Sequence, residues 1–135
     1  MLAPPNQGSE VIDVTRNWPT GDIIAGEAGL QLGTGPDSVP LQLGAVDFEL
    51  GVIAGTGSIN FLMSAMLPEP NDGKVSVAST RVDGMDDFLI VDNSHHYITE
   101  SAEVIRNTKS FLRDGSFVDS VAQSVAVVQP GRAGS

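Results

Sequence analysis

The stretch that decides the fold class is Phe48-Glu49-Leu50-Gly51-Val52-Ile53-Ala54. It begins with alternating apolar and polar residues and ends as a continuous apolar run, which is typical of a strand covered on both faces. Such strands occur mainly in parallel sheets. A second segment, Asp87-Phe88-Leu89-Ile90-Val91, has a similar apolar character and predicts a second strand.

The clearest helix follows this second strand. Ser101 is the expected N-cap, Glu103 adds a negative charge to the first turn, and Gly115 is expected to end the helix in the left-handed conformation. Its apolar residues share one face at helical spacing. They are Val104, Ile105, Thr108, Phe111 and Leu112.

The remaining segments are patterned less strongly. Residues 6–46 are rich in Gly, Pro and polar residues and are expected to form a loop-like crossover with short helices at 10–15 and 27–32. A further short helix is expected at 60–67, and an element of uncertain type at 74–80. Alternating strands and helices predict an α/β domain with a short parallel sheet of about three strands, ordered as in the chain and flanked by helices.

Composition excludes several classes of function. The chain has 135 residues, no cysteine and a net charge of −10, with an isoelectric point near 4.3. Cysteine chemistry is therefore absent, and the acidity argues against binding to nucleic acid or to anionic membranes. The longest apolar run, 61–67, is too short to cross a bilayer, and the N-terminus does not resemble a signal peptide. A cytoplasmic location is expected.

Two loops carry the residues best suited to chemistry. In a parallel sheet, reactive side chains collect at the carboxyl ends of the strands, here residues 55–73 and 92–99. The first loop contains Asp72 and the second contains His95 and His96, the only histidines in the chain. A carboxylate that accepts from histidine Nδ1 fixes the tautomer of a general base.

Other interpretations of these residues remain open at this point. Asp72 precedes a glycine, and most Asp-Gly pairs are simply turns. A metal site is disfavoured because adjacent histidines on extended backbone point to opposite faces. Gly55-Thr56-Gly57-Ser58-Ile59-Asn60 resembles a dinucleotide-binding turn, but Asn60 replaces the third glycine. Ser58 is disfavoured as a displaced nucleophile, since Thr56 replaces the preceding glycine.

Five segments, in order and spacing, together resemble the C-terminal part of bacterial α/β-hydrolases of the esterase/lipase type. They are Met1-Leu-Ala-Pro-Pro-Asn-Gln-Gly-Ser-Glu10, Asn71-Asp-Gly-Lys-Val-Ser-Val77, Arg81-Val-Asp-Gly-Met-Asp-Asp-Phe88, Ser94-His-His-Tyr-Ile98, and Glu103-Val-Ile-Arg106 with Phe111-Leu-Arg-Asp-Gly-Ser-Phe117. The resemblance covers residues 1–117 as a partial hydrolase domain and leaves 118–135 as a weakly structured tail.

The resemblance implies carboxylic-ester hydrolysis without a cofactor. By it, Asp72 is the triad acid and His95 the triad base, and the three strands are the last three of the hydrolase sheet. A threonine commonly follows the histidine in this family, whereas His96 stands here. This departure leaves His96 as the alternative base.

The nucleophile of such an enzyme is absent from the sequence. It lies on a Gly-x-Ser-x-Gly elbow, and no such pentapeptide occurs in this chain. We therefore expect the chain to derive from a truncated gene, an internal start or a fragment, and to be inactive alone. Its expected partner is a missing N-terminal half. An ester or lipid is the expected substrate only of the completed enzyme.

The alternative expectation is a non-catalytic remnant that self-associates or binds a partner. Under either reading, an open strand edge at residues 1–3 and uncovered apolar surface predict a homodimer or larger assembly. Its interface is expected to include the N-terminal edge and residues 8–46.

Overall fold

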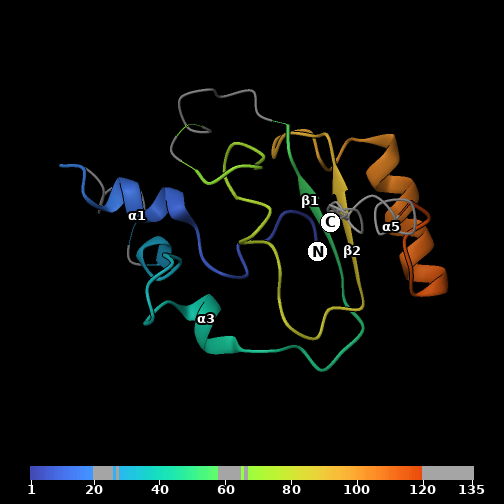
Figure 1. Cartoon of the computed structure of the whole chain (residues 1–135), viewed down its shortest axis with the longest axis horizontal. Helices are drawn as coiled ribbons and strands as arrows, with labels where there is room; N and C mark the ends of the chain where they lie inside the picture. The colour runs from blue at the N-terminus through green and yellow to red at the C-terminus, as the bar shows by residue number, and fades with distance from the viewer. Residues whose placement is uncertain (20–25, 27, 58–64, 66, 120–135) are drawn as a thin grey trace, which may run out of the picture.

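A computed structural model of the chain describes residues 1–19, 26, 28–57, 65 and 67–119. It is a mixed α/β fold whose helices lie on either side of a short parallel sheet (Figure 1). The elements, in chain order, are α1 (Glu10–Arg16), α3 (Val39–Leu43), β1 (Gly51–Gly55), β2 (Asp87–Val91) and α5 (Ala102–Asp114).

The sheet pairs β1 with β2 in parallel, with Gly51 opposite Asp87 and Gly55 opposite Val91. The expected parallel arrangement is therefore present, with two strands in the part of the chain that is described rather than about three. Residues 1–3 add only a single parallel bridge, between Leu2 and Ile53, on the other side of β1. Three residues are too few for repeated strand pairing. Residues 1–3 therefore contact β1 through one bridge and do not form a third strand.

β1 begins at Gly51, three residues later than the sequence pattern predicts. The backbone N–H of Leu50 donates to the carboxylate of Asp86 at 2.7 Å, so the pairing just before the strand involves a side chain. Phe48 is exposed instead of packing in the core. All five residues of β1 are buried, as expected for a strand covered on both faces.

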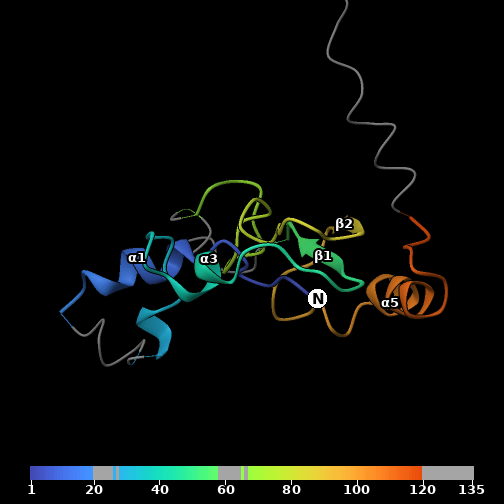
Figure 2. The ribbon, with the colours of Figure 1, turned by 90° about the horizontal axis from the view of Figure 1, so that it is seen from below.

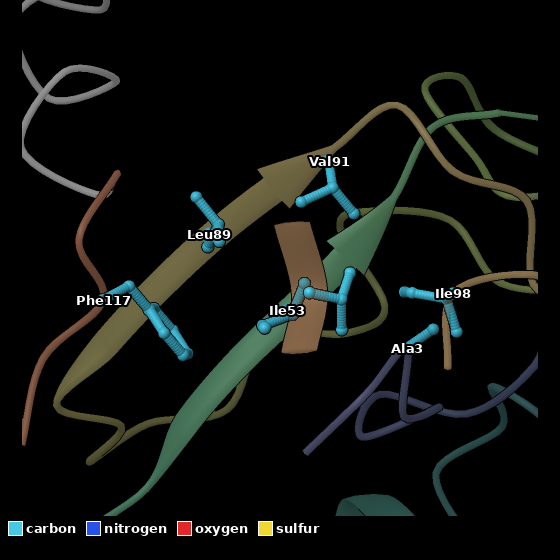
Figure 3. Close-up of a cluster of buried hydrophobic side chains, with 7 residues drawn as sticks. Ala3, Ile53, Leu89, Val91, Ile98 and Phe117 are labelled. Carbon is cyan, nitrogen blue, oxygen red and sulfur yellow. The ribbon is translucent and has the colours of Figure 1, made fainter. Parts of the chain in front are cut away.

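The core lies between the sheet, α5 and the segments next to them (Figure 3). Ile53 of β1 and Leu89 of β2 are almost completely buried, and Val104 of α5 packs against them. The cluster is completed by Ala3, Val91, Ile98 and Phe117, with Phe111 partly buried beside it.

α5 begins and ends where the sequence predicts. Ser101 Oγ accepts from the backbone N–H of Val104, and Gly115 closes the helix in the left-handed conformation with φ 75°. The expected apolar face is only partly correct, because Ile105 and Leu112 are exposed.

The buried face of α5 includes a polar residue, Asn107. Asn107 is fully buried because its amide donates to the Glu103 carbonyl at 3.0 Å and to Asp119 Oδ2 at 2.8 Å. Satisfied hydrogen bonds remove the penalty that burial of an amide otherwise carries.

The other expected elements have mixed outcomes. α1 coincides with the first short helix, whereas the short helix α3 was not anticipated. Residues 74–80 form bends and turns, with an isolated bridge at Ser76. The helix expected at 27–32 falls partly, and that at 60–67 mostly, outside the described residues, as do residues 120–135 of the expected tail.

Figures 1 and 2 place α1 and α3 together at one end of the molecule and α5 at the other, with the strands between them. Within the described ranges, no helix combines the length and apolarity needed to cross a membrane.

Candidate active site

The carboxyl ends of β1 and β2 lie side by side (Figure 1). Pairing continues beyond the strands, because Thr56 N–H donates to the Val91 carbonyl at 3.0 Å and Gly57 N–H to the Asn93 carbonyl at 3.1 Å. Two segments meet at this edge. We call them the acid loop (residues 68–80) and the histidine loop (residues 92–100).

Gly55 allows both loops to approach the end of β1. A Cβ atom at this position would lie 2.4 Å from the Asn93 carbonyl oxygen and 2.9 Å from Asp72 Cβ. Neither neighbour can withdraw without displacing its loop. The absence of a side chain at Gly55 therefore lets Asp72 pack directly against the strand.

Asp72 is buried and its carboxylate is held by the backbone of its own loop. Oδ1 accepts from the N–H groups of Lys74 at 3.0 Å and Val75 at 2.8 Å, which is the hydrogen-bond pattern of an Asx turn. The preceding Asn71 uses its own Oδ1 in the same way, accepting from Gly73 N–H at 3.0 Å. These contacts fix the Asp72 carboxyl group and leave Oδ2 for the neighbouring loop.

His95 meets that second oxygen. Its Nδ1 lies 2.8 Å from Asp72 Oδ2, and its backbone N–H donates to the Asp72 carbonyl at 3.1 Å. The Asp72 side chain is 1% exposed, whereas that of His95 is 31% exposed. Solvent therefore reaches the imidazole but not the carboxylate, and His95 Nε2 has no partner within the described part of the chain.

This arrangement suits a general base. When Nδ1 carries the proton that it donates to Asp72, the lone pair of the imidazole resides on Nε2. A carboxylate in this position also stabilises the imidazolium that forms when Nε2 takes up a proton. The dyad is thus able to accept a proton from a hydroxyl group or a water molecule brought to Nε2.

His96 is placed differently. It is exposed, and its ring stands edge-on to that of His95, with the centroids 6.4 Å apart and the planes at 88°. Among the described residues, the hydrogen bonds of the acid loop to the histidine pair go to His95.

A nucleophile is not found beside the dyad. Within residues 1–19, 26, 28–57, 65 and 67–119, no serine hydroxyl donates to His95. Ser94 is the nearest in sequence, but its Oγ is buried without a hydrogen-bond partner. Ser58, the displaced nucleophile weighed from the sequence, lies outside the described residues.

Among the described residues, no three His, Asp or Glu side chains lie close enough together to hold a metal ion.

Sequence reasoning missed a contact between the acid loop and α1. Glu10 of α1 accepts hydrogen bonds from the hydroxyl groups of Ser76 and Ser79, which lie on the acid loop. Glu10 and Ser76 are 66 positions apart, and no local pattern indicates that they meet. Only the path of the chain between them brings them together.

Comparison with known proteins gives no match: no family model fits the chain, and no curated protein or solved structure is significantly similar to it.

Proposed function

We propose that Asp72 and His95 are the acid and base of a serine-hydrolase triad, in the C-terminal portion of an esterase/lipase-type α/β-hydrolase. The observation that carries the proposal is the 2.8 Å contact between His95 Nδ1 and the buried Asp72 carboxylate, with Nε2 unpartnered in the described structure. Position at the carboxyl ends of two adjacent parallel strands supports it, because reactive groups collect there in open α/β sheets.

The proposed reaction is hydrolysis of a carboxylic ester. A serine hydroxyl transfers its proton to His95 Nε2 as its oxygen attacks the carbonyl carbon. The imidazolium then donates that proton to the departing alcohol, leaving an acyl-serine. A water molecule, deprotonated by His95, attacks the acyl group and releases the carboxylic acid and the free serine.

The serine must come from polypeptide that carries a nucleophile elbow. No Gly-x-Ser-x-Gly segment occurs among the 135 residues. We propose that an N-terminal hydrolase half supplies both this serine and the N–H groups that stabilise the oxyanion. Asp72 and His95 already lie in hydrogen-bonding contact without that segment.

The test begins with the DNA upstream of the codon for Met1. An in-frame Gly-x-Ser-x-Gly should be found there, and the extended protein should hydrolyse p-nitrophenyl butyrate. His95→Ala and Asp72→Asn should abolish most of that activity, while His96→Ala, the matched control, should retain it. Equal loss in His95→Ala and His96→Ala, or full activity in His95→Ala, would contradict the assignment.

Self-association is a second candidate function, favoured by an apolar groove between α3 and the segment before β1. The groove has a volume of about 530 Å³, and Asp47 is the only charged side chain of the described residues that lines it. Leu43 is 77% exposed at its border. We propose a second copy of the chain as the occupant of this groove. Across a two-fold axis, the exposed Leu43 of each copy would face the groove of the other. The apolar residues that line the groove include Leu32, Val39, Pro40, Leu43, Val46 and Phe48.

A further inference from the structure

The carboxylate of half-buried Glu10 forms a polar cluster with two serines. Its Oε1 accepts from Ser76 Oγ at 2.7 Å and from Ser79 Oγ at 2.6 Å, and the two hydroxyl oxygens are 3.0 Å apart. Both serines are buried. The cluster joins the first turn of α1 to the far limb of the acid loop.

The environment of Glu10 is unusual for a carboxylate. Its Oε2 is buried and has no hydrogen-bond partner, and among the described residues no cation pairs with the group. Burial of a carboxylate oxygen is unfavourable unless hydrogen bonds elsewhere on the group compensate it. In this position Glu10 Oε1 accepts two short charge-assisted hydrogen bonds from the acid loop.

Backbone contacts within the acid loop connect Ser76, which Glu10 holds, to the residues beside Asp72. Ser76 forms an antiparallel bridge with Asn71, the residue next to Asp72. Asp72 N–H donates to the Val75 carbonyl at 3.2 Å, and Val77 N–H donates to the Pro70 carbonyl at 2.8 Å. The loop thus folds back on itself, with Asp72 at its turn and Ser76 on the returning limb.

Other contacts hold the outer part of this limb without Glu10. Gln7 N–H donates to the Ser79 carbonyl at 2.9 Å, and the Asn6 amide donates to the Thr80 carbonyl at 2.8 Å. Loss of the Glu10 side chain therefore leaves the N-terminal segment attached at 79–80. It removes the contact that holds the part of the limb nearest Asp72 against α1.

From this connectivity we infer that Glu10 is a positioning residue for the dyad, which fixes the acid loop through Ser76 and Ser79 so that Asp72 stays aimed at His95. The inference rests on the proposed function, since it assigns a residue that orients the acid of the same site. Glu10 acts on the chemistry only through Asp72.

The test uses the tautomer of His95 as its readout. Nitrogen-15 NMR of the ring nitrogens in alkaline buffer distinguishes the Nδ1–H form, which Asp72 favours, from the Nε2–H form. The whole chain should show His95 mainly as Nδ1–H, with exposed His96 as an internal reference. In Glu10→Ala, the Nδ1–H fraction of His95 should fall to that of His96.

Two further variants separate positioning from general support of the fold. Glu10→Gln keeps an oxygen that accepts from both serines and should retain the Nδ1–H form. Asp13→Ala is the matched control, since Asp13 is also an acidic residue of α1 but binds Thr34, through its N–H at 3.1 Å and its hydroxyl. It should leave His95 unchanged.

The possible outcomes are distinct. A folded Glu10→Ala variant with an unchanged His95 tautomer overturns the inference, as does an equal loss in Asp13→Ala. If Glu10→Ala does not fold, the double variant Ser76→Ala/Ser79→Ala replaces it and should show the same loss of the Nδ1–H form. Absence of the Nδ1–H form in the unmodified chain would instead contradict the proposed dyad itself.

Discussion

Asp72 contacts His95 twice, through its side chain and through its backbone. Asp72 Oδ2 lies 2.8 Å from His95 Nδ1, and the Asp72 carbonyl accepts from His95 N–H at 3.1 Å. The backbone contact ties the two loops together independently of the ionisable groups. The geometry between the carboxylate and the imidazole is therefore set by the fold, and the proposed enzyme would use it as a preorganised acid–base pair.

Replacement of Asp72 by Asn should separate geometry from chemistry. The Asn carbonyl oxygen can still accept from the N–H groups of Lys74 and Val75, so the loop should keep its shape. The amide nitrogen that then faces His95 favours the wrong tautomer. In a completed enzyme we expect kcat to fall by about 10⁴-fold, the magnitude known for this change in a serine protease triad. A fall of less than about tenfold would contradict the role of Asp72.

The chain of 135 residues alone should hydrolyse p-nitrophenyl acetate barely faster than buffer. Triad members act as a unit, and loss of the nucleophile removes nearly all of the rate that the unit provides. His95→Ala should change the rate little, and a fluorophosphonate probe should not label the chain. Strong turnover that His95→Ala abolishes would reveal a nucleophile within the chain, and Ser58 would be the first residue to replace.

Two leucines offer a matched test of the core. Leu89 is fully buried in β2, whereas Leu112 of α5 is 80% exposed. Leu89→Ala should lower the free energy of unfolding by about 2–5 kcal/mol, because it removes buried methyl groups and leaves a cavity. Leu112→Ala should change it by less than about 0.5 kcal/mol. Urea unfolding measures both values, and equal losses would contradict the position of β2 in the core.

Stability should depend on pH through Asp119. The hydrogen bond from Asn107, and then that from Arg106, lowers the pKa of Asp119 below its usual 3.8. A depressed carboxyl pKa stabilises the folded state above the pKa of the unfolded chain, and this contribution is lost as pH falls through the lower folded-state value.

The chain should therefore be more stable than Asp119→Asn at about pH 6, and the difference should shrink once the pH falls below about 4. Glu100→Gln removes the same charge from an exposed site outside the apolar groove and serves as the control. Urea unfolding at several pH values measures the three proteins. A difference that persists unchanged in acid would show that the ionised carboxylate is not responsible.

Self-association should depend on the apolar groove. We expect a dimer in sedimentation velocity at micromolar concentration, with an interface of more than about 1,000 Å² in total. Leu43→Glu should give a monomer, because it places a charge at the border of the groove. Ile105→Glu, at an exposed position of α5, should leave the dimer intact. A monomeric chain at these concentrations would contradict the proposal.

Local pattern was sufficient for β1, β2, α1 and α5. Each is marked by neighbouring residues, whether a run of buried side chains such as 51–55 or the caps Ser101 and Gly115. The acid and histidine loops were also predictable, because the ends of adjacent parallel strands must share one edge of the sheet. α3 was missed because it has five residues, none of them buried, and so lacks an apolar stripe.

Tertiary structure alone decided which distant groups meet. Asn107 is buried in α5 in place of Leu112 because Asp119, twelve positions later, satisfies its amide. Glu10 reaches the acid loop because the chain returns to α1 after 66 residues, at Ser76. Sequence periodicity records which face of an element is apolar, whereas a buried polar contact depends on one donor and one acceptor brought together by the whole path of the chain.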